Sequence, residues 1–204
     1  MKPDKYMEHA NSLWSRMESI NPEEVGSNSL AEYSPGSGEF RVRFIDRLFS
    51  IRPRERSIVY LDTQKEADVF TSIVLLHYLL NAKNLPLTGQ VVSFKELWGG
   101  DIYFAAFSSR TIKPLVDIFS SEMDRFRDAG VALGGKVVEF GDCAVEVQAF
   151  PRIPVTLVIW QGDDEVPPSA NILFDSSIKD QMQTEDVTVV CSLIVSRMKK
   201  QKQQ

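Results

Sequence analysis

Strand-like segments of this chain come in closely spaced pairs, whereas its helix-like segments follow one another in runs. Phe40–Phe44 alternates aromatic or aliphatic residues with arginine, and Leu48–Ile51 follows across Ile45–Arg47, a spacing typical of a β-hairpin. Two more strand-like segments, Ala144–Phe150 and Val155–Trp160, are separated by a proline-rich turn. This pattern predicts an α+β fold with an antiparallel sheet built from hairpins, not a doubly wound parallel sheet.

About five helices are expected to pack with this sheet. Pro3–Ile20 carries apolar residues at helical spacing, and its proline suits a first helical turn. Lys65–Asn81 becomes apolar almost all round, which indicates a helix that runs through the core. The other three helices are predicted from Pro114, over Ser121–Leu133 before Gly134, and from Thr184.

The length of the chain favours one domain. With 204 residues, 43% of them hydrophobic, it can bury a sizeable core, so we expect a single domain, 1–204. Its Ser-, Gly- and Pro-rich segment 21–38 is predicted to be a mobile loop. The basic end of the chain, 199–204, is predicted to fray beyond the last helix.

Charge and cysteine content restrict the partners and the compartment. The 28 acidic side chains outnumber the 23 basic ones, and the net charge of −5 argues against a nucleic-acid partner. No segment approaches the ~18 apolar residues of a membrane span, and the N-terminus lacks the apolar core of a secretion signal. Cys143 and Cys191 make no disulfide framework. We therefore expect a reducing, cytoplasmic environment.

An acidic segment after the last strand-like run is the main candidate for a binding site. Asp163, Asp164 and Glu165 precede a rigid Pro-Pro pair and a short apolar return to Asp175. Their oxygens suit Mg²⁺ or Ca²⁺, although the spacing matches no calcium loop. Alternatively, two of them act as an acid–base pair, or all belong to a solvated turn. Glu185 would extend the cluster, but its place in a first helical turn also suits the helix dipole.

A second set of polar residues precedes the helix predicted from Pro114. Arg110 and Lys113, with neighbouring Ser and Thr hydroxyls, are candidates for contacting an anion at the helix N-terminus. No glycine-rich loop accompanies them. A capping hydroxyl with surface cations is the simpler interpretation.

Three further residues are candidates for lining a pocket. Trp98 stands beside a glycine pair, Trp160 directly precedes the acidic segment, and His77 lies in the apolar helix. A neutral, hydrogen-bonded core histidine is the simplest interpretation of His77. As a metal ligand it needs partners, and the other histidine of the chain, His9, lies on a different helix. The spacing of histidines and cysteines excludes a conventional zinc site, and no metal ligand is certain.

Several segments, in order along the chain, carry a resemblance to a known family. They are Leu75–Leu80, Leu87–Gly89, Tyr103–Phe107, Gly134–Gly135, Phe150–Pro154, Trp160–Glu165, Leu173–Asp175 and Thr184–Asp186. Together they resemble the domain of unknown function 3786, an uncharacterised family found mainly in anaerobic bacteria and archaea, over nearly the whole chain. Some members carry a four-cysteine segment that looks like an iron–sulphur site, and this sequence contains no such motif. The resemblance implies a fold and a compartment and supplies no activity.

Three functional hypotheses follow. The first is a cytoplasmic binding or accessory module, without catalysis, that contacts a metal ion or a polar small molecule through the acidic segment. The second is a metal-assisted hydrolase or transferase that uses the same carboxylates. The third is a protein–protein interaction module that docks its partner through segment 21–38 and the acidic segment.

Overall fold

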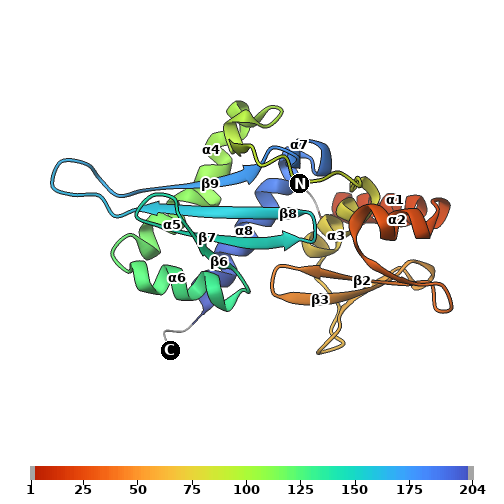
Figure 1. Ribbon diagram of the computed structural model, residues 1–204. Coiled ribbons are helices and arrows are strands. Elements are labelled where there is room, and N and C mark those ends of the chain that lie inside the picture. Colours follow the sequence, from red (N-terminus) through yellow and green to blue (C-terminus); the bar gives the residue numbers. More distant parts are fainter. Residues whose placement is uncertain (1–2, 202–204) are drawn as a thin grey trace. The chain divides into compact units, whose positions relative to one another are not determined.

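The computed structural model describes residues 3–201 of the chain, which divides into two compact units (Figure 1). Unit 1 comprises the residues up to Pro86 together with 150–152 and 180–182, and unit 2 comprises the other described residues. Each unit is built around its own antiparallel sheet. The expectation that 1–204 forms a single domain stays a prediction.

Unit 1 contains a four-stranded sheet in the order β1-β2-β3-β4, with every neighbouring pair antiparallel. The predicted hairpin is confirmed: β2 pairs with β3, and Val42 lies opposite Phe49. The elements of this part of the chain are α1 (Pro3–Ser19), α2 (Pro22–Ser29), β1 (Glu32–Ser34), β2 (Glu39–Phe44), β3 (Arg47–Arg52), η1 (Pro53–Glu55), β4 (Ser57–Tyr60) and α3 (Val69–Asn81).

An aromatic stack lies in the core of unit 1. The ring of Phe150 stacks on Tyr78 of α3, with ring centres 4.1 Å apart, and on Phe44 of β2, at 4.5 Å. All three side chains are buried. The hydroxyl of Tyr78 donates a hydrogen bond of 2.6 Å to the carbonyl of Ser29, so the one polar atom of the stack has a partner.

The prediction that segment 21–38 is a loop was wrong. Asn21 caps the helix α2 by accepting a hydrogen bond from the N–H of Glu23, and Pro22 occupies the first turn. Leu30 ends the helix in a left-handed conformation, and β1 then pairs with β2. The same Ser, Asn, Pro and Gly residues that suggest a loop also cap short helices, which is why composition misled here.

Unit 2 contains a five-stranded sheet in the order β5-β9-β8-β7-β6. Every residue of β8 except Trp160 is buried, as expected for a central strand. The elements of this part of the chain are β5 (Val91–Ser93), η2 (Phe94–Glu96), α4 (Gly100–Arg110), α5 (Ile112–Phe119), α6 (Met123–Ala132), β6 (Lys136–Val138), β7 (Cys143–Phe150), β8 (Ile153–Trp160), β9 (Ser169–Asp175), α7 (Ile178–Gln181) and α8 (Thr184–Lys200).

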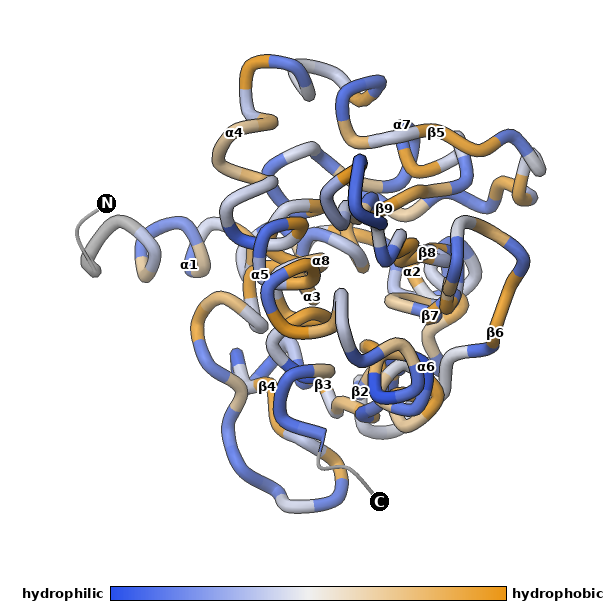
Figure 2. The backbone as a smooth tube through the Cα atoms, turned by 90° about the vertical axis from the view of Figure 1, so that its left-hand side faces the viewer, coloured by the Kyte–Doolittle hydropathy of each residue, from blue (hydrophilic) through white to orange (hydrophobic). Residues whose placement is uncertain are grey.

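Helices cover the core of unit 2. Helix α8 contacts α4, α5 and α6, and α5 contacts β9. The segments around α5 and α8 are largely hydrophobic, as Figure 2 shows, and Leu115, Phe119, Cys191 and Ile194 are buried there. Burial of such side chains is the main stabilising contribution to this unit.

The α+β class is therefore confirmed, with two corrections. Two antiparallel sheets are present where one was predicted. The helices also exceed the predicted number of about five, since α2, α4 and α7 were not expected. At the C-terminus, Lys199 and Lys200 still belong to α8, whereas residues 202–204 of the predicted frayed tail lie outside the described residues. Within 3–201, none of the helices combines the length and apolar character needed to span a bilayer.

Candidate functional site

The acidic segment forms the exposed turn between β8 and β9 in unit 2. The carboxylate of Asp163 accepts hydrogen bonds from the N–H groups of Glu165 and Val166, at 2.9 and 2.8 Å. These two bonds hold the pKa of Asp163 below its ordinary value. Asp164 and Glu165 point into solvent. Asp163 thus shapes the turn, as an Asx-type residue does.

The structure does not bring the predicted acidic residues together. Trp160 lies opposite Ser169 at the turn end of the β8–β9 pair, whereas Asp175 is the last residue of β9, at the opposite end. The seven residues of β9 separate Asp175 from the turn by about 20 Å at the usual strand rise. Figure 1 shows the β8–β9 connection projecting beyond the sheet.

Glu185 is exposed in the first turn of α8, where the helix dipole favours an acid. Among the described residues, no group of three or more His, Cys, Asp or Glu side chains is placed to hold a metal ion.

Asp175 instead joins the segment that precedes β5 to the end of β9 through hydrogen bonds. Its carboxylate accepts hydrogen bonds from the N–H of Thr88 (3.1 Å), the N–H of Gly89 (2.8 Å) and the N–H of Ser177 (2.9 Å). The Thr88 hydroxyl donates a further bond. Burial raises the pKa of Asp175, but the bonds from Ser177, Thr88 and Gly89 outweigh it and lower the pKa to about 2.

This arrangement gives a testable stability effect. Asp175→Asn is expected to lower the free energy of unfolding by about 1–2 kcal/mol at pH 7, because four donors lose a charged acceptor. The pKa is lowered on folding, so the contribution is complete above the ordinary value of 3.8 and is lost as the pH falls toward 2. Urea denaturation of both proteins at pH 7 and pH 3 measures the difference.

The matched control is Asp164→Asn on the exposed turn, which should change the free energy of unfolding by less than about 0.5 kcal/mol. If the Asp175→Asn difference were the same at pH 7 and pH 3, its carboxylate charge would not be what stabilises the fold.

At the predicted anion site of Arg110 and Lys113, the hydroxyls of Ser109 and Thr111 are engaged within the helix. The Thr111 side chain is buried and donates to the carbonyl of Phe107 at 2.7 Å, and Ser109 donates to Ala106 at 2.9 Å. Both hydroxyls therefore serve the end of α4. Arg110 and Lys113 are exposed, and neither makes an ion pair with another described residue.

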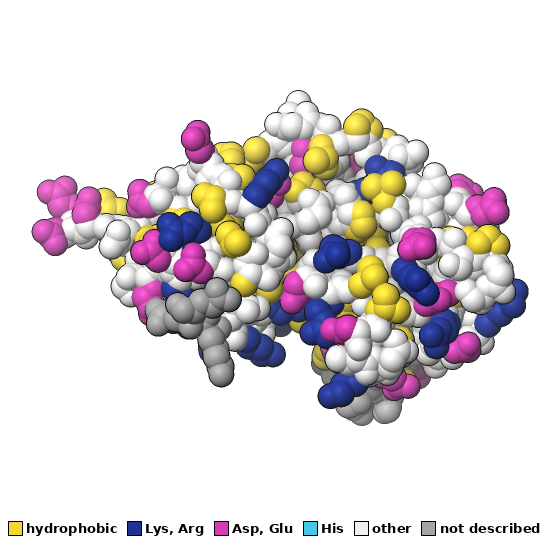
Figure 3. Space-filling view, turned by 60° about the horizontal axis from the view of Figure 1, so that its bottom comes forward, with side chains coloured by type: hydrophobic (Ala, Val, Ile, Leu, Met, Phe, Trp, Pro, Cys, Tyr) yellow, Lys and Arg dark blue, Asp and Glu magenta, His cyan; other side chains and the backbone are white. Residues whose placement is uncertain are grey.

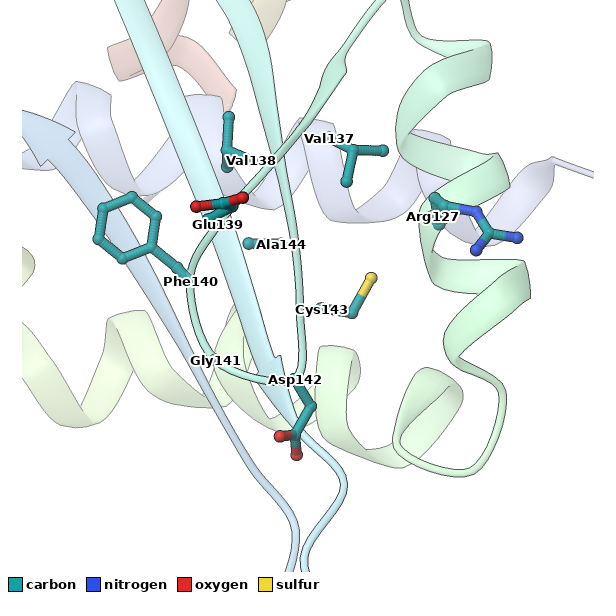
Figure 4. A pocket seen from close by; sticks show the side chains of 9 residues that line it. All are labelled: Arg127, Val137, Val138, Glu139, Phe140, Gly141, Asp142, Cys143 and Ala144. Carbon is teal, nitrogen blue, oxygen red and sulfur yellow. The ribbon is translucent and has the colours of Figure 1, made fainter.

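A pocket of about 540 Å³ lies beside the β6–β7 turn and is lined by residues 137–144 and Arg127 of α6 (Figure 4). In Figure 4 the thiol of Cys143 points to the side of the hairpin on which Arg127 lies. Burial raises the pKa of Cys143, so its sulfur is a protonated thiol at neutral pH and a poor nucleophile. Arg127 is already paired with Asp124 at 2.8 Å and Asp128 at 3.5 Å. The lining thus offers neither a thiolate nor an unpaired cation.

The three residues predicted to line a pocket have separate places. Trp160 lies next to the turn of this pocket: a Cβ added to Gly141 would come within 3.0 Å of its ring. His77 lies half-buried on α3 in unit 1, where its Nε2 is 2.9 Å from Nε2 of His9. Trp98 does not line this pocket, and 87% of its surface is exposed.

Among the described residues, Trp98 is the most exposed large hydrophobic side chain. Its indole lies in solvent although its backbone is fixed, since its carbonyl accepts a 2.7 Å hydrogen bond from the Thr184 hydroxyl. The residues on either side are held as well. Leu97 is buried, and a Cβ at Gly100 would lie 2.0 Å from the carbonyl oxygen of Phe94. Large apolar side chains that stay in water on a rigid backbone mark interaction sites more often than random surface.

Helix α4 extends this exposed region. Ile102 is 82% exposed and Tyr103 43% exposed, and Ala106 and Arg110 follow Ile102 at intervals of four residues, on the same side of the helix. We call Trp98, Ile102, Tyr103, Ala106 and Arg110 the α4 surface. Sequence reasoning missed Ile102 and Tyr103, because helix α4 itself was not predicted.

A comparison with known protein families shows to which family the chain belongs. Residues 21–197 match the family described as Domain of unknown function (DUF3786). The chain belongs to this family. The resemblance inferred from the sequence motifs is thereby confirmed. No curated protein and no solved structure matches the DUF3786 chain.

Charge on the DUF3786 protein is mixed rather than segregated on the face that Figure 3 shows. Lysine and arginine side chains lie there among aspartates and glutamates and form no continuous basic surface. Proteins that bind nucleic acid ordinarily present a continuous basic surface. The expectation that this protein binds no nucleic acid stays a prediction.

Proposed function

We propose that this DUF3786 protein is a docking module that binds a partner protein through the α4 surface. The observation that carries the proposal is Trp98, whose side chain is 87% exposed on a backbone fixed by Thr184. The partner we infer presents an apolar hollow for the indole, edged by carboxylates. Among the three hypotheses from the sequence this is the interaction module, but with a different contact surface.

Trp98 has the properties of a binding anchor. Transfer of a tryptophan side chain out of water removes about 150–250 Å² of surface, a gross stabilisation of about 4–6 kcal/mol. The fixed backbone means that little conformational freedom of residues 97–100 is lost on binding. Ile102, one turn into α4, would add apolar contact beside it.

Electrostatics define the chemistry of the partner. Arg110 lies on the same side of α4 as Ile102. Within the described residues, Arg110 forms no ion pair. A carboxylate on the partner would complement it, even though the chain as a whole has a net charge of −5.

The other two hypotheses have less support. A metal-ion or hydrolase site at the acidic segment needs carboxylates that converge, and the turn of Asp163 lies at the opposite end of β9 from Asp175. A small-molecule site at the β6–β7 pocket would lack an available cation, because Arg127 is paired twice.

Site-specific crosslinking tests the proposal. We suggest replacing Tyr103, an exposed aromatic residue of the α4 surface, with the photo-reactive p-benzoylphenylalanine in the source organism and identifying the protein that becomes attached on irradiation. That protein is then purified, and its Kd is measured by calorimetry with the natural chain. Trp98→Ala is expected to weaken binding about 30-fold or more, the loss typical of an interface anchor. Arg110→Glu should weaken it most at low salt.

Val166→Ala is the matched control, because Val166 is an exposed apolar residue on the β8–β9 turn. This variant should bind the partner with unchanged affinity. Trp98→Ala should also keep the melting temperature of the natural chain, since its indole is already in water. The proposal fails if Trp98→Ala binds the purified partner as tightly as the natural chain, or if no protein is crosslinked at position 103.

A further inference from the structure

The two histidines of the chain meet across a helix–helix contact in unit 1. His9 lies on α1 and His77 on α3, with their Nε2 atoms 2.9 Å apart and their ring centres 5.0 Å apart. The ring planes are inclined by 72°. We infer that this pair is a binding site for a first-row transition dication such as Ni²⁺ or Cu²⁺. The two Nε2 atoms would coordinate the ion, and water would occupy its remaining positions.

The separation of the two nitrogens suits such an ion. Imidazole nitrogens bind these metals at about 2.0–2.1 Å, so two of them at a right angle lie about 2.8–3.0 Å apart. Right angles between neighbouring ligands are characteristic of the square-planar and tetragonal sites that Cu²⁺ and Ni²⁺ prefer. The observed 2.9 Å between the two Nε2 atoms falls in this range, and the rings, whose centres are 5.0 Å apart, would have to turn toward a shared ion. Without metal, one ring donates its Nε2–H to the Nε2 of the other. On metal binding that proton is exchanged through solvent to the Nδ1 of the same ring, so that both Nε2 lone pairs are available to the ion.

Packed helices hold both rings in place. Next to His9 on α1, Ala10 is buried, and on α3 the neighbours of His77, Leu76 and Tyr78, are fully buried. Tyr6 and Phe70 make a second contact between the same helices, edge to face at 4.9 Å. Side chains on rigid, packed elements lose little freedom when they coordinate an ion. His9 itself is exposed, so an ion can reach the pair from solvent.

The two imidazole ligands also determine which metal ions should bind only weakly. Within the described residues, no third His, Cys, Asp or Glu joins the pair. Two imidazole nitrogens are poor ligands for Mg²⁺ and Ca²⁺, which prefer oxygen ligands. Affinity should follow the usual order for nitrogen ligands, with Cu²⁺ above Ni²⁺ and both far above Mn²⁺. This site is independent of the α4 surface and of the acidic segment.

Calorimetric titration of the protein with Ni²⁺ at neutral pH, without a polyhistidine tag, is the first test. One Ni²⁺ per chain is expected to bind, and His9→Gln and His77→Gln should each weaken it at least tenfold. At a free concentration 100 times the Kd, Ni²⁺ should raise the melting temperature by about 5–10 °C, as expected for a ligand that binds only the folded chain. Mg²⁺ should produce no shift.

Two controls separate this pair from other candidate ligands. Asp163→Asn with Glu165→Gln removes carboxylates of the exposed turn, and Cys143→Ser removes the half-buried thiol; neither should change the Kd for Ni²⁺. The electron paramagnetic resonance spectrum of the Cu²⁺-loaded natural protein should show coupling to two imidazole nitrogens.

The electron paramagnetic resonance spectrum of the Cu²⁺-loaded natural protein tests the two-imidazole site even if His77→Gln does not fold. The proposal is overturned if the natural protein binds neither ion, if His9→Gln binds Ni²⁺ unchanged, or if the Cu²⁺ spectrum shows fewer than two nitrogens.

Discussion

Phe150→Ala is expected to lower the free energy of unfolding by about 3–5 kcal/mol, the range for removing a fully buried phenylalanine ring. The ring of Phe150 has no exposed surface and is stacked between Phe44 and Tyr78. The substitution therefore removes two aromatic contacts and leaves a cavity in the core of unit 1. Urea denaturation followed by circular dichroism measures the change.

The same substitution at an exposed ring provides the control. Phe70 on α3 is 46% exposed, and Phe70→Ala should cost no more than about 1 kcal/mol. Equal losses for the two variants would mean that burial in the stack is not the origin of the effect.

Gly100→Ala is expected to cost about 3 kcal/mol, near the upper end for introducing atoms into a closely packed site. A Cβ at Gly100 would lie 2.0 Å from the carbonyl oxygen of Phe94 and 3.0 Å from backbone atoms of Lys95. These are main-chain atoms, so no side chain can turn aside to relieve the contact. The start of α4 must shift, and with it the loop that presents Trp98.

Gly36→Ala distinguishes this steric effect from the general loss of a glycine. No atom lies within 4 Å of a Cβ added at Gly36, and its φ is not in the left-handed region. A neutral or slightly stabilising effect, up to about 1 kcal/mol, is expected there. Gly100→Ala should also weaken the proposed partner complex, measured as Kd with the purified partner. A Gly100→Ala protein as stable as Gly36→Ala would show that the tight approach is absent.

Features that depend on neighbouring residues could be predicted from the sequence. The alternation in Phe40–Phe44 gave the β2–β3 hairpin, and the stripe of apolar residues in 3–20 gave α1 to within one residue. Gly134 lies two residues beyond α6, with a φ of 79°, as expected for a residue that ends a helix. In each case the period or the backbone conformation is set locally.

Features that depend on which distant parts of the chain meet in space could not be predicted from the sequence. The sequence places Asp163 and Asp175 only twelve positions apart, which suggests one cluster. An extended strand between them carries the second carboxylate about 20 Å away, and hydrogen-bonding partners from Thr88 and Gly89 then engage it. Likewise, His9 and His77 lie 68 positions apart, and only the packing of α1 on α3 makes them neighbours.

Both sheets terminate in their shortest strands, which limits how this protein can associate. In unit 2 the outermost strands β5 and β6 have three residues each, and in unit 1 β1 has three and β4 has four. These short edge strands expose few unsatisfied main-chain donors and acceptors. Another chain that added a strand there would therefore form few hydrogen bonds. Fibril-like stacking of strands from several chains is therefore disfavoured. Partners are expected to contact side chains on helices and turns instead.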